Sequence, residues 1–562
     1  MRASTVRSRQ PDHASWWRSA VIYQVYPRSF CDSDGDGVGD LNGITGKLDY
    51  IAGLGVDAIW LSPFFRSPQA DFGYDVADYC AVDPVFGTLD DFDRLLERAH
   101  RLGLRVLIDQ VWSHTSVEHA WFASSRAAPT GPHADWYVWA DARPDGTPPN
   151  NWLSVFGGSA WTWDARRRQY YLHHFLSSQP QLNLHHPQVR QAVLAAGEFW
   201  LDRGVDGFWL DAVDFYLHDP LLRDNPPAAC AHAPVKPFAM QRHVHDMLHP
   251  DIPQFLGEIR ALTDRYGAVT LAEVSSQDGA IERVHGYTHG ERMLHMAYTL
   301  RLSREPFSVD TFRDLIERMR RSERPGATCW SFSNHDVERA ISRWAGERDP
   351  RFHRLLMALS LSLKGAVCLY QGEELALTEA RLAREDLRDP FGITYYPHFR
   401  GRDGSRTPMP WDATQPHAGF TAPGARPWLP LSDEHVPLAA RQAHEDPGSL
   451  LHAYRTFLAW RRDAGFADAD IGVEPLPQPL LGLRRGDVLC VFNLCPQEAI
   501  VEVSGAHPLA GHGFDCELVD GRARLPGYGV FFGRLADSPP AARAAGPTRR
   551  PAGPAAAALP AA

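Results

Sequence analysis

Three acidic residues stand at the ends of short apolar runs that read as strands: Asp211 in GFWLDAV, Glu273 in TLAEV and Asp336 in FSNHD. Because burying an unpaired charge is costly, stability explains such acids poorly. One acid alone could cap a following helix, but three of them, at the ends of the fourth, fifth and seventh predicted strands, favour chemistry. Retaining sugar chemistry uses one carboxylate to attack the anomeric carbon and a second, protonated carboxyl to donate to the leaving oxygen. We therefore predict a site that acts on glycosidic bonds.

Two histidines accompany these acids in the sequence. His114 lies in DQVWSHTS and His335 directly precedes Asp336. Imidazole nitrogens can hydrogen-bond the hydroxyl groups of a sugar ring. Each histidine can equally be a buried residue whose nitrogens are satisfied by the protein, and the sequence leaves this alternative open.

Residues 32–40 read DSDGDGVGD and suit a hard divalent cation, because oxygen ligands alternate there with glycines that allow a sharp turn. The alternative is a solvated acidic turn without an ion. As the loop precedes the first predicted helix, far from the three acids, the metal would be structural. The predicted ligands are the carboxylates of Asp32, Asp34, Asp36 and Asp40 and the backbone carbonyl of Val38.

Eight apolar runs separated by helical patterns must position these residues. Such alternation predicts an α/β protein with a parallel (β/α)8 TIM barrel, whose chemistry sits at the carboxyl ends of the strands. The expected strands are 21–30, 56–64, 104–111, 206–213, 268–275, 291–299, 327–336 and 366–375.

Two long excursions interrupt the alternation. The first follows the third strand, is rich in Trp, Tyr, His and Pro, and is too long for a simple loop, so we expect an insertion subdomain over the active site. The second, 215–250, follows the fourth strand. The expected division is 16–112 and 187–465 for the catalytic barrel, 113–186 for the insertion, 466–536 for a C-terminal antiparallel β-sandwich and 537–562 for a disordered Ala/Pro-rich tail.

The composition excludes several classes of protein. The chain has 562 residues with 44% hydrophobic and 22% charged residues, which argues against a disordered chain or a coiled coil. Its net charge of -11 argues against nucleic-acid binding. No apolar run predicts a membrane span or a secretory signal, and the eight scattered cysteines lack metal-binding spacing. We expect a cytoplasmic protein with free thiols.

Ten segments in register resemble glycoside hydrolase family 13, the α-amylase family, in its α-glucosidase and oligo-1,6-glucosidase branch. The resemblance spans residues 16–411. The segments are VIYQVYPRSF, DSDGDGVGDLNGI, VDAIWLSPFFRSP, DFGYDVADY, DQVWSHTS, GFWLDAV, LAEV, SNHDVERA, YQGEEL and GRDGSRTPMPW.

The resemblance implies a role for each matching residue. Asp211 would be the nucleophile, Glu273 the general acid/base and Asp336 the transition-state stabiliser. Asp75 and Arg402 would together grip the non-reducing end of the substrate. The metal in the acidic loop would be Ca²⁺ or Mg²⁺, and no organic cofactor is implied. The substrate-binding residues would be Tyr74, Asp75, His114, His335, Arg339 and Arg402.

The chain departs from the family pattern at three positions. Trp209 replaces the arginine two residues before the nucleophile, and strand alternation directs it to the same side as Asp211, toward the barrel interior and the sugar. Without that positive charge we expect a raised nucleophile pKa and reduced turnover. Ser113 replaces an asparagine that binds calcium in amylases, and Gln181 replaces an acid in Gln-Pro-Asp-Leu-Asn.

These observations predict a retaining, exo-acting α-glucosidase that acts on maltose and short α-1,4 oligosaccharides or glucosides, with glucosyl transfer to alcohols as a close variant. Ala212, directly after the nucleophile, is similar to α-1,4-preferring members. The expected partner is a small α-glucoside, with no nucleic acid and no membrane. Two alternatives remain: a sucrose- or trehalose-directed enzyme, and a sugar-binding barrel whose catalysis Trp209 impairs.

Overall fold

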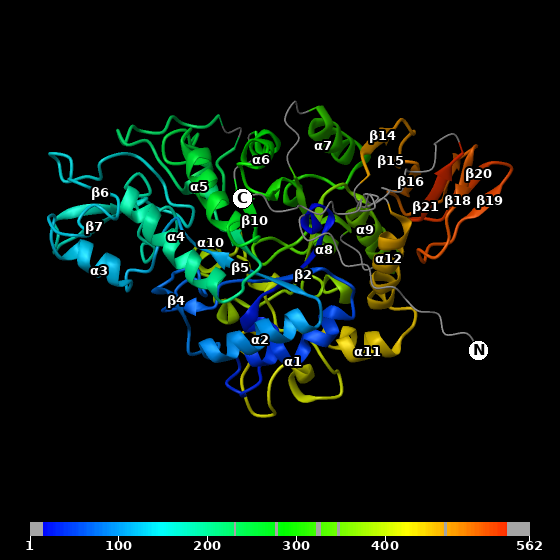
Figure 1. Cartoon of the computed structure of the whole chain (residues 1–562), viewed down its shortest axis with the longest axis horizontal. Coiled ribbons are helices and arrows are strands. Elements are labelled where there is room, and N and C mark those ends of the chain that lie inside the picture. Colours follow the sequence, from blue (N-terminus) through cyan, green and yellow to red (C-terminus); the bar gives the residue numbers. More distant parts are fainter. Residues whose placement is uncertain are drawn as a thin grey trace, which may run out of the picture.

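The computed structural model describes residues 15–229, 232–275, 279–321, 327–345, 349–465 and 469–536. The predicted tail, 537–562, lies outside the described residues. In Figure 1 the small sheet of the insertion, within residues 139–172, lies at one end of the molecule. Strands within residues 506–525 lie at the opposite end, with the central barrel between them.

A closed parallel barrel forms the centre of the molecule, and all eight predicted strands are confirmed in it. Neighbouring strands pair in the order β11-β10-β9-β5-β2-β1-β13-β12, and an isolated parallel bridge between Ala297 and Thr328 joins the two ends. The strands are β1 (Val21–Val25), β2 (Ala58–Leu61), β5 (Arg105–Gln110), β9 (Gly207–Leu210), β10 (Val269–Val274), β11 (Met296–Thr299), β12 (Cys329–Ser331) and β13 (Ala366–Tyr370).

These strands form because their apolar residues are covered on both faces, as parallel sheets require. Every residue of β1, β2, β9, β10 and β13 is buried. Inside the barrel, Trp60 of β2 stacks on Trp209 of β9, with ring centroids 3.3 Å apart and planes within 7°. The interior is therefore a packed core that leaves the strand ends to carry the chemistry.

Amphipathic helices surround the barrel. In α2, Phe92, Leu95, Leu96 and Ala99 face the core at helical spacing, and a capping box joins Thr88 with Asp91 at its start. The helices outside the insertion are α1 (Leu41–Ala52), α2 (Leu89–Arg101), α4 (Pro187–Asp202), α5 (Ile252–Asp264), α6 (Ala280–Thr288), α7 (Val309–Arg321), α8 (Ala340–Ala345), α9 (Pro350–Ser362), α10 (Pro390–Tyr395), α11 (Ala440–Glu445) and α12 (Leu450–Ala464).

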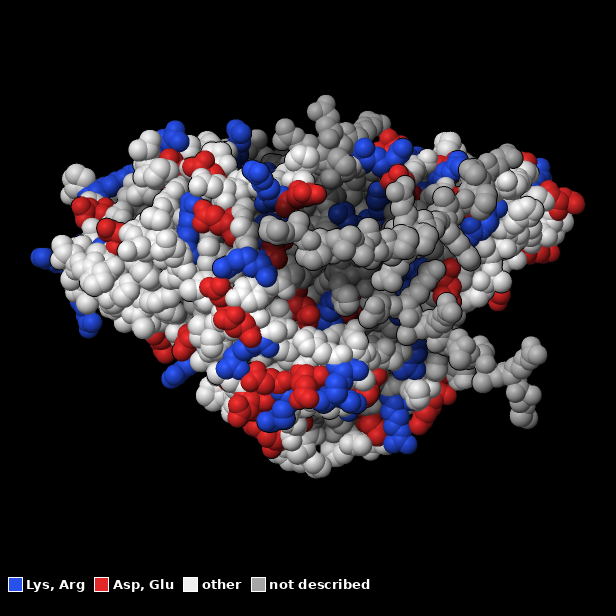
Figure 2. Space-filling view, in the orientation of Figure 1, with Lys and Arg blue, Asp and Glu red and all other residues white. Residues whose placement is uncertain are grey.

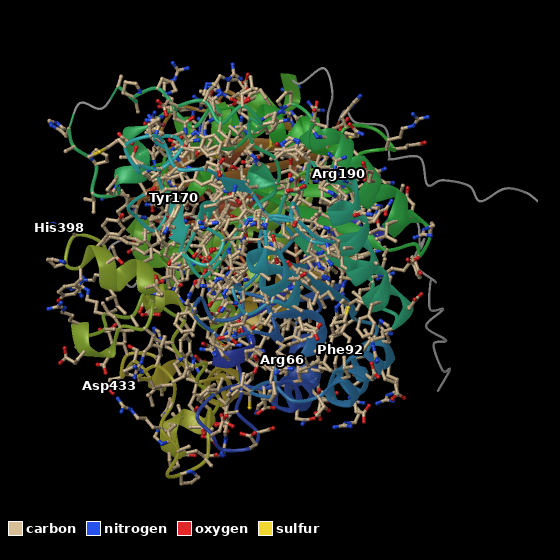
Figure 3. The ribbon with its side chains drawn as sticks, turned by 90° about the vertical axis from the view of Figure 1, so that its left-hand side faces the viewer. Arg66, Phe92, Tyr170, Arg190, His398 and Asp433 are labelled. Atoms are coloured by element: carbon tan, nitrogen blue, oxygen red, sulfur yellow. The ribbon has the colours of Figure 1, made fainter. Side chains whose placement is uncertain are left out.

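The excursion between β5 and α4 has a small core of its own, built on Trp152, Trp161 and Leu172. It contains α3 (Ala120–Ala127) and a three-stranded antiparallel sheet of β6 (Trp139–Ala140), β8 (Gln169–Leu172) and β7 (Trp161–Asp164). Figure 3 shows Tyr170 of β8 toward the same edge of the molecule as His398, which follows α10. A two-stranded antiparallel sheet, β3 (Phe65–Arg66) with β4 (Asp78–Val82), follows β2.

The end of the described chain forms two antiparallel sheets that share one apolar core. Leu480, Val491 and Phe531 of the first sheet cluster with Ala523 and Leu525 of the second. The first sheet has the order β14 (Ile471–Glu474), β15 (Leu480–Arg485), β16 (Val488–Asn493), β21 (Val530–Leu535), β18 (Ala506–Pro508), and the second β17 (Ala499–Glu502), β20 (Arg522–Leu525), β19 (Glu517–Val519).

Two further expectations concern cysteines and surface charge. Seven cysteines of the described chain are free thiols, namely Cys31, Cys80, Cys329, Cys368, Cys490, Cys495 and Cys516. Figure 2 shows basic and acidic side chains interspersed over one face, without a broad basic surface. Across the described residues, every helix is too short or too polar to span a bilayer.

Candidate active site

One large cavity of about 2260 Å³ brings the three predicted acids together. Asp211 follows β9, Glu273 lies in β10 and Asp336 follows β12, so all three sit at carboxyl ends of barrel strands. The other predicted residues in its wall are Tyr74, His114 and Arg402. The three carboxyl groups have different surroundings, and these set different protonation states.

Glu273 is held by two hydroxyl groups. The Tyr298 hydroxyl donates to Oε2 at 2.5 Å, and the Ser275 hydroxyl donates to Oε1 at 3.1 Å. Burial, together with repulsion from Asp336, raises the pKa of Glu273 to about 7. A carboxyl group with such a pKa exchanges its proton near neutrality, as a general acid/base must.

Of the three acids, Asp336 has its negative charge most strongly compensated by neighbouring cations. Its Oδ1 accepts hydrogen bonds from Arg406 at 2.7 Å and from Arg402 at 3.1 Å. Burial opposes ionisation, but these guanidinium groups outweigh it and hold the pKa of Asp336 well below its usual range. Asp336 is therefore a permanent carboxylate, suited to oppose positive charge that develops on a sugar.

Asp211 lacks such a cation. Its backbone N–H donates to the Gln110 carbonyl at 3.2 Å, but no arginine or lysine of the described chain forms an ion pair with its carboxyl group. Burial, followed by repulsion from Asp109 and Glu273, raises the pKa of Asp211 well above its usual range. This is the direction predicted from the missing arginine.

Trp209 fills the interior of the barrel. Its indole lies between Trp60 and the ring of Tyr298, whose centroid is 4.6 Å away, and only 1% of Trp209 is exposed. The predicted inward direction is correct, but Trp209 is not part of the cavity wall, so it does not face the sugar directly. It is an apolar layer beneath the acids.

The structure contradicts the predicted pair of Asp75 and Arg402. Asp75 is fully buried and accepts hydrogen bonds from Ser67 Oγ at 2.9 Å and the Ala70 N–H at 2.8 Å, which fix a turn. The acidic partner of Arg402 in the cavity is Asp71, with 2.8 Å between Arg402 Nη2 and Asp71 Oδ1. Asp75 is a turn-forming residue, and Asp71 takes its expected place.

Tyr74 connects the histidines to the floor of the cavity. Its hydroxyl lies 2.6 Å from His335 Nε2 and donates to Asp109 Oδ2 at 3.1 Å. His335 is therefore behind Tyr74 and outside the cavity wall. His114 lines the cavity, with Nε2 2.9 Å from the Tyr74 carbonyl, and burial lowers its pKa to about 4. It is a neutral ring at physiological pH.

Arg339 does not reach the cavity, contrary to its predicted role in substrate binding. Its side chain is 1% exposed and donates to the carbonyl groups of Gln371 at 3.0 Å and Ser405 at 2.9 Å. A guanidinium group occupied by two backbone carbonyls holds the loops behind the site together. Arg339 is thus a structural residue.

Besides Asp71, the sequence reasoning missed four residues in or around the site. Gln179 lies 3.1 Å from Asp71 and 3.3 Å from His114. Asp109 is fully buried below Tyr74, and its Oδ1 lacks a hydrogen-bond partner among the described atoms. Asp109 lies in DQVWSHTS and Arg406 in GRDGSRTPMPW, two segments that resemble the family, so the resemblance could have pointed to both. The four are Asp109, Gln179, Asp389 and Arg406.

Gln181, which replaces an acid of the family pattern, connects the insertion with the nucleophile loop. Its Nε2 donates to the Phe215 carbonyl at 2.8 Å, and its Oε1 lies 2.9 Å from His174 Nδ1. A carboxylate has no N–H to donate, so it could not form the first bond. Ser113 likewise turns inward, with Oγ 2.7 Å from His114 Nδ1.

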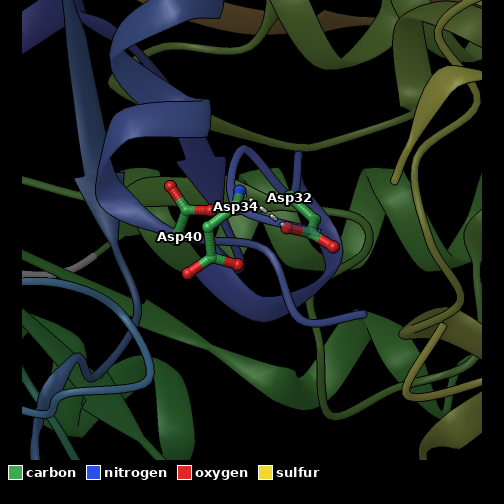
Figure 4. A group of neighbouring side chains, drawn as sticks. All are labelled: Asp32, Asp34 and Asp40. Atoms are coloured by element: carbon green, nitrogen blue, oxygen red, sulfur yellow. Dashed lines mark hydrogen bonds between the residues drawn. The ribbon is translucent and has the colours of Figure 1, made fainter. Parts of the chain in front are cut away.

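The acidic loop gathers three of its predicted ligands. Carboxylate oxygens of Asp32, Asp34 and Asp40 all lie within 4.8 Å of one another (Figure 4). These hard oxygen donors fit Ca²⁺ or Mg²⁺. Asp36 lies outside this group and accepts the Val38 N–H at 2.7 Å, so Asp36 and the Val38 carbonyl stay predicted ligands.

Comparisons with known proteins agree with this geometry. Residues 24–468 match the sequence model of the alpha amylase catalytic domain. The chain is 50% identical over 554 residues to a probable alpha-glucosidase of Rhizobium meliloti, covering 95% of this chain and 100% of the relative. It is 36% identical over 484 residues to an oligo-1,6-glucosidase of Parageobacillus thermoglucosidasius, covering 80% of this chain and 84% of the relative. The crystal structure of the alpha-glucosyl transfer enzyme XgtA superposes with a TM-score of 0.89 at 50% identity, covering 92% of this chain and 99% of that one.

Proposed function

The chain belongs to the α-amylase family, in its α-glucosidase and oligo-1,6-glucosidase branch, and is a glycoside hydrolase; from this premise we propose that it removes terminal α-1,4-linked glucose from maltose and short oligosaccharides or glucosides with retention of configuration. One observation carries the proposal. Asp211, Glu273 and Asp336 line one cavity that also contains the Asp71–Arg402 ion pair.

The two reacting acids have different roles. Glu273 donates a proton, whereas Asp211 must react as its carboxylate, a form that its raised pKa makes scarcer, which should therefore slow turnover. Glu273 protonates the glycosidic oxygen while Asp211 attacks the anomeric carbon, so the aglycone leaves as an alcohol and a β-glucosyl ester forms on Asp211. Glu273, now a carboxylate, takes a proton from water, whose oxygen displaces Asp211. Two inversions return an α-configured glucose, and both acids recover their starting states.

The ion pair of Asp71 and Arg402 supports exo action. Arg402 is 10% exposed and Asp71 6% exposed, so both charges face the cavity from a nearly closed wall. Charged groups that hydrogen-bond the hydroxyls of a terminal glucose would leave no space for a further sugar on that side. Ala212, in the wall next to Asp211, is consistent with a preference for α-1,4 linkages.

Transfer to alcohols is the close variant of this reaction. An alcohol that reaches the β-glucosyl ester can replace water as the acceptor. The likeness to the structure of an alpha-glucosyl transfer enzyme and the size of the cavity, about 2260 Å³, support this proposal.

The remaining proposals concern the metal and the compartment. Asp32, Asp34 and Asp40 would hold a structural Ca²⁺ or Mg²⁺, which would stabilise the loop that precedes α1 and take no part in the reaction. The free thiols support a cytoplasmic location, where thiols stay reduced. The partner is the α-glucoside itself, and we propose no organic cofactor.

Glucose release from maltose, with Asp211→Asn as the blank, tests the proposed function. We expect release in the parent protein only. With 4-nitrophenyl α-D-glucoside, whose leaving group has no anomeric centre, NMR of the glucose first formed should show the α-anomer. A β-anomer would refute retention, and equal signals from parent and blank would refute the proposed hydrolysis. Faster hydrolysis of sucrose or trehalose than of maltose would instead assign a different substrate class.

A further inference from the structure

One of the three lysines of the chain lines the active-site cavity. Lys236 lies in the excursion after β9, directly before the short helix η4 (Pro237–Met240). Its Nζ is 3.6 Å from the ring centroid of Phe399 and 4.2 Å from that of Phe391. The ammonium group is therefore held against two aromatic rings at the wall of a site for uncharged sugars.

No carboxylate of the described chain forms an ion pair with Lys236. The nearby acid Asp389 is already occupied, because its two oxygens accept from Arg402 Nε at 3.1 Å and Nη2 at 2.8 Å. Burial, followed by repulsion from Arg304 and Arg402, lowers the pKa of Lys236 to about 8. Aromatic rings compensate a buried cation only in part.

Lys236 lies between the proposed glucose-binding group and the side of the proton donor. Its charge is acted on by both Arg402 and Arg304, and Arg304 follows β11, whose Tyr298 holds Glu273. The guanidinium carbon of Arg402, which pairs with Asp71, lies 5.2 Å from the Phe156 ring centroid. Phe156 contacts Phe391 at 4.9 Å, and Phe391 contacts Phe399 at 4.9 Å. This row of rings leads from the glucose-binding arginine to Lys236. The cavity, at about 2260 Å³, has room for a second group there.

We propose that Lys236 forms an anion-binding part of the aglycone subsite, and that the preferred aglycone or acceptor carries a carboxylate or phosphate group. The inference rests on the proposed glucosidase activity and names its substrate class. An anion on the aglycone would complete the ion pair that the protein leaves open, and a charge-assisted hydrogen bond would orient the leaving oxygen toward Glu273.

The alternative is that Lys236 only attaches its loop to α10 through the cation–π contact. The chain offers a matched control for that role. Lys47 makes the same kind of contact, with Nζ 4.4 Å from the Trp411 ring centroid, but it is outside the cavity wall. Removing the charge of Lys47 therefore tests a structural cation–π contact without touching the subsite.

The experiment compares two aryl α-glucosides of the same shape, 4-carboxyphenyl and 4-carbamoylphenyl α-D-glucoside. The readout is the kcat/KM ratio of the anionic to the neutral substrate, measured for the parent protein, Lys236→Met, Lys236→Arg and Lys47→Met. We expect the ratio to fall about tenfold in Lys236→Met. It should stay near the parent value in Lys236→Arg and in Lys47→Met.

The pH dependence of the parent protein provides a second readout that needs no variant. Lys236 must be protonated to bind an anion, so the ratio should fall as the pH rises through about 8. The charged groups around it are Arg304, Arg402 and Asp389, and Arg402 and Asp389 are paired with each other. Comparing trehalose 6-phosphate with trehalose then decides whether phosphate is accepted as well as carboxylate.

The possible outcomes separate the two proposals. An unchanged ratio in Lys236→Met, or a parent ratio that does not vary with pH, overturns the anion subsite while the glucosidase proposal stands. No hydrolysis of the neutral glucoside by the parent protein overturns the glucosidase proposal, and the subsite with it. Should Lys236→Met fail to fold, the pH dependence alone decides.

Discussion

Below the catalytic acids, position 209 holds an indole, and the balance of charge around Asp211 follows from that residue. Four carboxyl groups act on one another there, those of Asp109, Asp211, Glu273 and Asp336. Of these four, only Asp336 accepts hydrogen bonds from guanidinium groups, those of Arg402 and Arg406. Neighbouring carboxyl groups cannot all ionise in a buried site. Protons bound to some of them must therefore take the place of the positive charge that an arginine at position 209 would supply.

Trp209→Arg tests this balance directly. A guanidinium group beside Asp211 should lower its pKa, so the acid limb of the kcat/KM profile should move to lower pH and turnover should rise. Losing the stack on Trp60 should cost stability by about 3 kcal/mol, seen as a lower Tm. Trp209→Phe is the control, since it removes the indole without adding charge and should leave the acid limb in place. A shift in both variants would contradict the electrostatic explanation.

Asp109→Asn should leave activity at neutral pH nearly intact. Burial, together with repulsion from Glu273 and Asp336, raises the pKa of Asp109 well above its usual range, so the fold favours the protonated group, which an amide resembles. A carboxyl group that binds its proton more tightly when folded loses stability as the pH rises above its unfolded value. Melting curves should therefore show a gain in Tm for the variant at pH 8 and little difference at pH 4. An inactive but folded variant would show that Asp109 works as a carboxylate.

Glu273 should set the basic limb of the activity profile. With a pKa of about 7, it loses the proton that the leaving oxygen needs as the pH rises past neutrality. Glu273→Gln should lower kcat/KM on maltose about 10³-fold. The first step on 4-nitrophenyl α-glucoside should be affected far less, because that leaving group needs no proton, and a burst of 4-nitrophenol would reveal it. An equal loss on both substrates would argue against an acid role.

At the level of elements, the strands were predictable and the loops were not. Strands buried on both faces have continuous apolar sequences. The sequence alone therefore predicted β9, β10 and β12 and the acidic residues at or after their ends. The partner of Arg402 depends on a turn that directs Asp71 to the cavity and Asp75 to the turn's own N–H groups. Two aspartates four residues apart look alike in sequence, since only the folded turn distinguishes them.

Asp71→Asn and Asp75→Asn should therefore fail in different ways. The first removes a charge that faces the substrate, so kcat/KM on maltose should fall about tenfold or more. The second leaves backbone N–H groups with a weaker acceptor inside the protein. The free energy of unfolding should therefore fall by about 1–3 kcal/mol, seen as a lower Tm. Kinetics and thermal melting on both variants check the assignment. The reverse pattern would restore Asp75 as the substrate-binding acid.

Over the whole molecule, the sequence predicted the barrel, the excursions and the C-terminal sheets because each has its own apolar periodicity and turn residues. It could not predict Arg339, whose bonds to the Gln371 and Ser405 carbonyls join segments distant in sequence. Nor could spacing show that Asp36 lies outside the group formed by Asp32, Asp34 and Asp40.

The metal proposal makes a prediction about global stability. Saturating Ca²⁺ or Mg²⁺, at about 100 times its Kd, should add about 2.7 kcal/mol to the free energy of unfolding, and EDTA should remove it. Asp34→Ala should abolish the effect, whereas Asp36→Ala should weaken it less because Asp36 lies outside the group. Equal melting temperatures with metal and with EDTA would favour the solvated acidic turn.

The single bridge between Ala297 and Thr328 gives the barrel a seam. On one side stands β11, whose Tyr298 holds Glu273, and on the other β12, which leads to Asp336. Elsewhere around the ring neighbouring strands share several paired residues, so backbone amides at the seam should exchange their hydrogens with deuterated water soonest among the barrel strands. Opening there would separate the proton donor from the permanent carboxylate. The weakest join of the ring thus runs between two groups whose spacing the reaction requires, and a bound sugar that spans them should slow the exchange.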